Sequence, residues 1–119
     1  MLADPQSVTV GGTAISLPRT GVQGNLADYT SADGVTSLRV QQSSTASQKR
    51  TSVVLRTAKI AADPISGINS RKTATVSITV NQPIDGFTVT ELKDQLVALC
   101  TLLTASSAAT AIKILGGEK

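Results

Sequence analysis

Residues 36–57 read TSLRVQQSSTASQKRTSVVLRT and predict two β-strands joined by a polar turn at residues 44–48. Apolar and polar residues alternate on both sides of the turn, and a period of two is typical of a sheet with one face buried. The apolar face would carry Leu38, Val40, Val53 and Leu55. The wet face would carry Ser37, Arg39, Gln41, Ser43, Arg50, Ser52, Val54 and Arg56. Because that face is basic and hydroxyl-rich, and the stretch holds no acidic residue, it suits a polyanionic ligand.

The segments around this stretch predict more sheet. Residues 6–19 form a hairpin in which Gly11-Gly12 makes the turn, and Pro18 ends its second strand. Residues 20–25 are expected to be a loop, residues 26–31 a weakly patterned short strand, and Asp33-Gly34 a turn. A slip in the alternation near residue 60 predicts a bulge or the end of the second long strand. After a loop at residues 61–69, a third long strand is expected over residues 71–80.

The period changes to a helical one after residue 87. Thr88 and Glu91 match a capping box, and apolar residues then follow at spacings of three and four. The apolar surface is wider than one stripe, so a second helix or a partner subunit must cover it. A break at Ser106-Ser107 leads to a short second helix over residues 108–115, which Gly116-Gly117 ends. The prediction is one α+β domain over residues 1–119, with the hairpin at 6–19, the sheet at 26–80 and two helices at 88–115.

Composition narrows the class of protein. Only 2% of the 119 residues are aromatic, so one subunit would have a thin aliphatic core, which favours a partner subunit. The net charge is +3, and between residues 36 and 83 Asp63 is the only acid among seven basic residues. Concentrated basicity indicates nucleic-acid binding, although Lys and Arg that merely protect strand edges from aggregation would give the same pattern.

Several kinds of chemistry have no support in the sequence. There is no histidine and one cysteine, Cys100, so neither a disulfide within the chain nor a metal site is expected. No nucleotide-binding or catalytic motif occurs, and we expect no cofactor, no small-molecule substrate and no enzymatic activity. The N-terminal residues do not resemble a signal peptide, and the strongly apolar run at residues 96–103 is too short to cross a bilayer. We therefore expect no membrane partner.

The order of these elements resembles that of the coat proteins of single-stranded RNA bacteriophages, the leviviruses. The resemblance covers the whole chain: the hairpin SVTVGGTAISL, then PRTGV, a turn that begins with Gln42-Ser43-Ser44, a return strand that opens with Lys49-Arg50, and the strand RKTATVSITV before the helices. It implies an interlocked homodimer in which helices of one subunit clasp the sheet of the other. It further implies an icosahedral shell, usually T=3 with 180 subunits, that packages genomic RNA, and repression of replicase translation through an RNA hairpin. The location would be the virion, assembled in the cytoplasm of a bacterial host.

The resemblance also assigns residues. The RNA-binding residues that it implies are Ser37, Arg39, Gln41, Ser43, Arg50, Ser52, Arg56, Thr73, Thr75 and Ser77. The dimer-interface residues are Leu92, Leu96, Leu99, Leu103 and Ile112. Two positions depart from the family pattern: Thr73 stands where well-known members have a base-stacking tyrosine, and Val54 where a basic residue is common. Hairpin-specific repression depends on such stacking more than genome packaging does.

Two other classes of protein fit parts of the sequence. A small RNA-binding β-sheet regulator without a shell would share the basic strands, but such modules usually stack bases on exposed aromatic rings, which are nearly absent here. A bacterial adhesion or pilus domain would share the strands, but the expected absence of a signal peptide counts against it.

Overall fold

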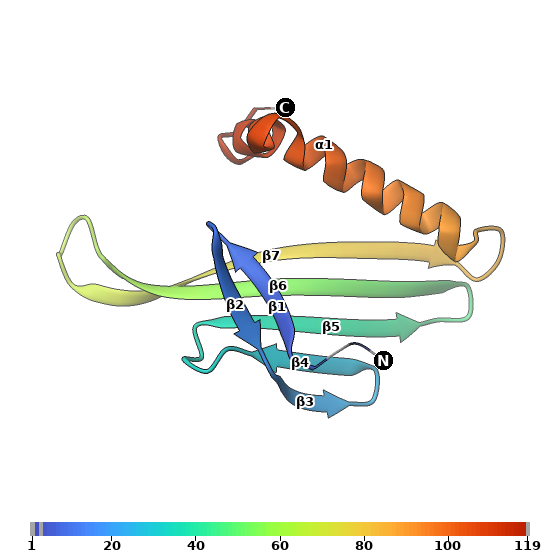
Figure 1. Cartoon of the computed structure of the whole chain (residues 1–119), viewed down its shortest axis with the longest axis horizontal. Helices are drawn as coiled ribbons and strands as arrows, with labels where there is room; N and C mark the ends of the chain where they lie inside the picture. The colour runs from blue at the N-terminus through green and yellow to red at the C-terminus, as the bar shows by residue number, and fades with distance from the viewer. Residues whose placement is uncertain (1, 3, 119) are drawn as a thin grey trace. The chain divides into compact units, whose positions relative to one another are not determined.

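A computed structural model describes residue 2 and residues 4–118 of the chain. They fall into two compact units, residues 1–81 and residues 82–119. Seven strands and one helix are assigned in the described residues (Figure 1). The strands are β1 (Gln6–Val10), β2 (Thr13–Leu17), β3 (Arg19–Gln23), β4 (Leu26–Thr30), β5 (Thr36–Ser44), β6 (Gln48–Ala62) and β7 (Asn69–Pro83), and the helix is α1 (Val89–Leu115).

The first unit is an antiparallel sheet with a separate hairpin. β1 and β2 pair with each other across Gly11-Gly12, as predicted, and β3 to β7 form a five-stranded sheet in chain order. β2 contacts β5, so the hairpin lies against the sheet (Figure 1). The predicted pairing of the two long strands is confirmed, since Leu38 lies opposite Leu55 and Val40 opposite Val53.

The turn between β4 and β5 is built around one carboxylate. The Asp33 side chain accepts a hydrogen bond from the Ser31 hydroxyl at 2.5 Å and another from the Val35 N–H at 3.0 Å. The Ser31 hydroxyl oxygen also accepts from the buried Thr36 N–H at 3.1 Å. These bonds close the predicted turn and fix the register in which β4 meets β5.

The core of the described chain is small, as the lack of aromatic residues predicts. Leu17, Tyr29 and Ala58 are its buried hydrophobic residues. Arg19 lies over the Tyr29 ring, 5.5 Å from the ring centroid, and its Nη2 donates to the Tyr29 hydroxyl at 3.3 Å and to the Leu2 carbonyl at 2.8 Å. The arginine thereby connects the N-terminal residues to the sheet.

Three strand boundaries differ from the prediction. Residues 20–25 do not form a loop, because Arg19–Gln23 is strand β3, with a bulge between Arg19 and Gly21. β6 continues to Ala62 without a break near Ile60, and β7 is longer than expected, Asn69–Pro83. In each case a neighbouring strand supplies hydrogen-bond partners, and pairing of this kind overrides weak local alternation.

The second unit contains α1, which begins as predicted. The Glu91 N–H donates to the Thr88 hydroxyl at 3.2 Å, and the Thr88 N–H donates to the Glu91 carboxylate at 3.4 Å, so the capping box is present. The prediction of two helices is wrong, because one helix is assigned over Val89–Leu115. The expected break appears as a kink inside it: Ala105 is extended, and Ser106, Ser107 and Ala108 have φ values of 55°, 58° and 64°. Two helical segments thus meet at the kink and are counted together as α1.

α1 is long and apolar enough in composition to span a membrane, and it is the one such helix in the described part of the chain. The run at residues 96–103, predicted from the sequence to be too short to cross a bilayer, is only part of this helix. The regular part before the kink, residues 89–104, has a length of about 24 Å, whereas the hydrocarbon core of a bilayer is about 30 Å thick. The kink thus leaves the straight segment short of a bilayer-spanning length.

Candidate nucleic-acid interface

The register of β5 and β6 brings the predicted polar residues of these strands onto one face. Ser37 lies opposite Arg56, Gln41 opposite Ser52, and Ser43 opposite Arg50. Directly opposed residues of an antiparallel pair share a face, and alternate residues of one strand do as well. The structure therefore groups all seven β5 and β6 candidates, Ser37, Arg39, Gln41, Ser43, Arg50, Ser52 and Arg56, on one side of the sheet.

Two shallow hollows lie on this face. The first, of about 340 Å³, is lined by Thr20, Asp28, Thr30, Ser37, Arg39, Gln41, Val54 and Arg56. The second, of about 250 Å³, is lined by Gln41, Ser43, Arg50 and Ser52. Gln41 borders both, so the two hollows form one continuous polar strip along β5 and β6.

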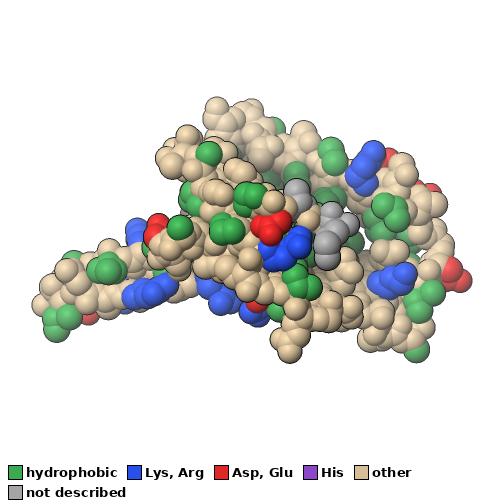
Figure 2. All heavy atoms as spheres, turned by 60° about the horizontal axis from the view of Figure 1, so that its bottom comes forward, with side chains coloured by type: hydrophobic (Ala, Val, Ile, Leu, Met, Phe, Trp, Pro, Cys, Tyr) green, Lys and Arg blue, Asp and Glu red, His purple; other side chains and the backbone are tan. Residues whose placement is uncertain are grey.

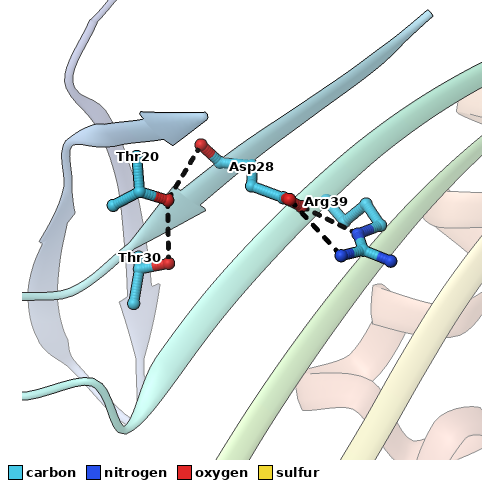
Figure 3. Close-up of polar contacts among 4 residues, drawn as sticks. All are labelled: Thr20, Asp28, Thr30 and Arg39. Carbon is cyan, nitrogen blue, oxygen red and sulfur yellow. Dashed lines mark hydrogen bonds and ion pairs between the residues drawn. The ribbon is translucent and has the colours of Figure 1, made fainter. Parts of the chain in front are cut away.

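The first hollow contains a carboxylate that the sequence analysis missed. Asp28 on β4 lies opposite Arg39 on β5. Arg39 Nε donates to Asp28 Oδ1 at 2.7 Å, and Arg39 Nη2 donates to Asp28 Oδ2 at 3.3 Å (Figure 3). This two-point contact raises the pKa of Arg39, first through the hydrogen bond to Asp28 and then through the opposite charge. The signal was available, since counting outward from the turn at Asp33-Gly34 pairs residue 28 with residue 39.

Two threonines, Thr20 and Thr30, line the same hollow. Thr20 falls at the bulge of β3, where the register shifts between Arg19 and Gly21. Its hydroxyl donates to the Asp28 carbonyl at 3.3 Å and lies 3.1 Å from the Thr30 hydroxyl (Figure 3). The bulge thus turns a hydroxyl toward the hollow and links β3 to β4 beside Asp28.

The other two arginines of the face differ from Arg39. Arg50 and Arg56 are exposed, and neither takes part in an ion pair among the described residues. Figure 2 shows several Lys and Arg side chains on the visible surface, with Asp or Glu side chains beside some of them. The face is therefore an interrupted row of cations, which can contact successive phosphates of a single strand.

The β7 candidates are less tightly connected to this strip. Thr73, Thr75 and Ser77 occupy alternate positions of one strand and all are exposed. None of them lines either hollow. Their assignment to RNA binding remains a prediction from the resemblance.

The predicted dimer-interface residues lie on a helix that has no buried residue. Leu92, Leu96 and Leu103 are half-buried, whereas Leu99 is 52% exposed and Ile112 is 64% exposed. Other large apolar residues of α1 are exposed as well, and they are Val89, Val97, Leu102, Ile114 and Leu115. These exposed apolar residues lie both before and after the kink at residues 105–108.

The described residues contain no group of three His, Cys, Asp or Glu side chains that could hold a metal ion. Cys100 is a free, half-buried thiol on α1.

Several solved structures of bacteriophage coat proteins and virus-like particles have a similar fold. No protein-family model and no curated protein sequence matches the chain. The chain is similar to the virus-like particle of bacteriophage AVE019 with a TM-score of 0.71 at 19% identity, over 90% of this chain and 97% of that one. It is similar to the virus-like particle of Beihai levi-like virus 21 with a TM-score of 0.69 at 17% identity, over 97% and 94% of the two chains. It is similar to the protein capsid of bacteriophage GA with a TM-score of 0.62 at 20% identity, over 94% of this chain and 92% of that one.

These matches extend over nearly the full length of both chains in each comparison. The protein therefore has the coat-protein fold of levivirus-type phages, and the resemblance inferred from the sequence is confirmed at the level of the fold.

Proposed function

We propose that this protein is a capsid subunit of a single-stranded RNA bacteriophage, with a structural and not an enzymatic role. The observation that carries the proposal is the extent of the fold match, which covers 97% of the AVE019 chain and 94% of the Beihai levi-like virus 21 chain. The solved relatives are described as virus-like particles, which implies self-assembly of their subunits.

The subunit would act as a homodimer. An exposed, mainly aliphatic helix is costly in water, because each large apolar side chain contributes about 1.5–3 kcal/mol when it is fully buried. α1 has no buried residue and presents Leu99, Leu102 and Ile112 at half exposure or more. A second copy of the chain, with its own α1, supplies a matching apolar surface.

The polar strip on β5 and β6 would bind the packaged RNA. Arg50 and Arg56 are exposed cations, and hydroxyl and amide side chains lie on the same face of the sheet. This combination of side chains is suited to contacts with phosphate and ribose. No aromatic side chain lines either hollow, so contacts to the RNA backbone would dominate over base stacking. Binding of this kind serves packaging directly, and repression of replicase translation would need a hairpin that is recognised without a stacking tyrosine.

The shell would be icosahedral, with 180 subunits in the T=3 arrangement that the resemblance implies, and assembled in the bacterial cytoplasm into the virion. Expression of the chain alone in bacteria tests this proposal. We expect closed, uniform particles in the electron microscope that contain nuclease-protected host RNA. A chain that stays monomeric or dimeric at all concentrations and salts would contradict the capsid role. A dimer that binds RNA but never forms particles would instead support the small regulatory RNA-binding protein.

A further inference from the structure

The first hollow on the face proposed to bind RNA contains one carboxylate, that of Asp28. Asp28 is directed toward Arg39 by the register of β4 and β5, and its two oxygens take two of the guanidinium donors, at 2.7 Å and 3.3 Å. The pair is accessible to solvent, since the Arg39 side chain is 49% exposed and the Asp28 side chain 32%. It is the one ion pair on this face among the residues that the structure describes.

A bidentate carboxylate resembles a phosphate in the geometry of its contact with arginine. Both ligands offer two oxygens to two parallel N–H donors of the guanidinium fork. An RNA phosphate that approached Arg39 in this orientation would have to displace Asp28, and the released carboxylate would then lie beside the phosphate with the same sign of charge. The charged groups lining this hollow are Arg39, Arg56 and Asp28, so the carboxylate cancels half of the positive charge that the two arginines provide.

We propose that Asp28 is an internal competitor that restrains RNA binding by occupying Arg39. Arg56 can contact an RNA phosphate directly, whereas Arg39 can contact one only after the phosphate has displaced Asp28. This inference rests on the proposed RNA-binding role of the face and specifies how its affinity is set. Asp28 is a specificity-determining residue in this account: it weakens binding to RNA in general and leaves Arg39 for RNA that presents a phosphate at that position. The Thr20 and Thr30 hydroxyls support the arrangement by fixing the backbone of β4 beside the carboxylate.

The size of the effect follows from counterion release. Each phosphate contact with a single strand contributes about 0.7 to the slope of the logarithm of the binding constant against the logarithm of the salt concentration. At about 0.1 M salt, one such contact corresponds to about fivefold tighter binding. Asp28→Asn keeps the shape of the side chain and removes its charge. We therefore expect this variant to bind RNA about fivefold more tightly at about 0.1 M salt, with a slope steeper by about 0.7.

The test uses the full chain freed of nucleic acid and a short fluorescein-labelled oligouridylate, with binding followed by anisotropy over a range of salt concentrations. Asp85→Asn is the matched control, since it makes the same change in net charge outside the polar strip. We expect it to bind as the unaltered chain does. We also expect Arg39→Ala to weaken binding more in the Asp28→Asn background than in the unaltered chain, because Arg39 is available to RNA only there. Asp28→Ser removes the charge and has a different shape, and it should show the same gain in RNA affinity as Asp28→Asn. Thermal unfolding of each variant checks that the variant is folded.

Weaker binding by Asp28→Asn and Asp28→Ser would overturn the inference, because it would mean that Asp28 orients Arg39 for RNA. Equal binding by all variants would overturn it as well, and so would an absence of binding by every variant, which would also remove the proposed RNA-binding role. Particle formation is scored separately in the electron microscope. A chain that forms no particles but gains affinity through Asp28→Asn would contradict the capsid role and leave this inference in place.

Discussion

The exposed apolar surface of α1 gives the sharpest test of dimerisation, through the substitution Leu99→Ala. Leu99 is 52% exposed in the single chain, so a partner can still bury about half of its side chain. Burial of a whole leucine contributes about 1.5–3 kcal/mol, and the remaining half therefore contributes about 1 kcal/mol. Because a two-fold interface contains each residue twice, the variant should lose about 2 kcal/mol of dimer stability, or about 30-fold in Kd.

Sedimentation equilibrium of the full chain, under conditions in which particles are dissociated, measures this change. Val22→Ala is the control, because Val22 is 53% exposed on β3 and outside the helix. We expect the control to leave the dimer Kd unchanged. If Leu99→Ala and Val22→Ala shift the dimer equilibrium equally, or not at all, the helix surface is not the interface.

Two further results are expected. The double variant Arg39→Ala, Arg56→Ala should bind RNA at least about fivefold more weakly at about 0.1 M salt, so its particles should contain less RNA while its dimers persist. If the ratio of nucleic-acid to protein absorbance of purified particles is unchanged, neither residue belongs to the RNA-binding surface. The second concerns acid stability, because the Ser31 hydroxyl and then the Val35 N–H hold the pKa of Asp33 below its usual 3.8. A lowered folded-state pKa stabilises the fold above the unfolded value and the contribution disappears as pH falls through the folded value. The difference in urea stability between the unaltered chain and Asp33→Asn should therefore be constant above about pH 4 and shrink below it, and a difference independent of pH would contradict this.

Much of the sheet was predictable because its signals are local. The alternation in residues 36–57 and the turn at residues 44–48 give the β5–β6 register in which Ser37 meets Arg56. β3 was missed because Gly21 and a bulge interrupt its short pattern, and it forms a strand only through pairing with β4. A prediction from one strand at a time cannot contain this information.

The face on which the site lies was predicted, but the partner of Arg39 was not. Parity along β5 places Arg39 on the polar side, but its partner comes from another strand and depends on the β4–β5 turn. Arg39 was therefore predicted to be free for phosphate, whereas the structure pairs it with Asp28. The break at Ser106-Ser107 and the helical segment beyond it were both predicted from the sequence, and the backbone geometry adds that Ser106, Ser107 and Ala108 have positive φ values at the kink.

We propose that two copies of the chain cover their α1 helices and present a common sheet surface to RNA within a shell. The decisive measurement is electron cryomicroscopy of the chain expressed alone in bacteria. We expect closed particles in which Leu99 and Ile112 of each subunit are buried against a second copy, with RNA density along β5 and β6. Particles in which α1 is solvent-exposed, or RNA that lies against another surface, would contradict it.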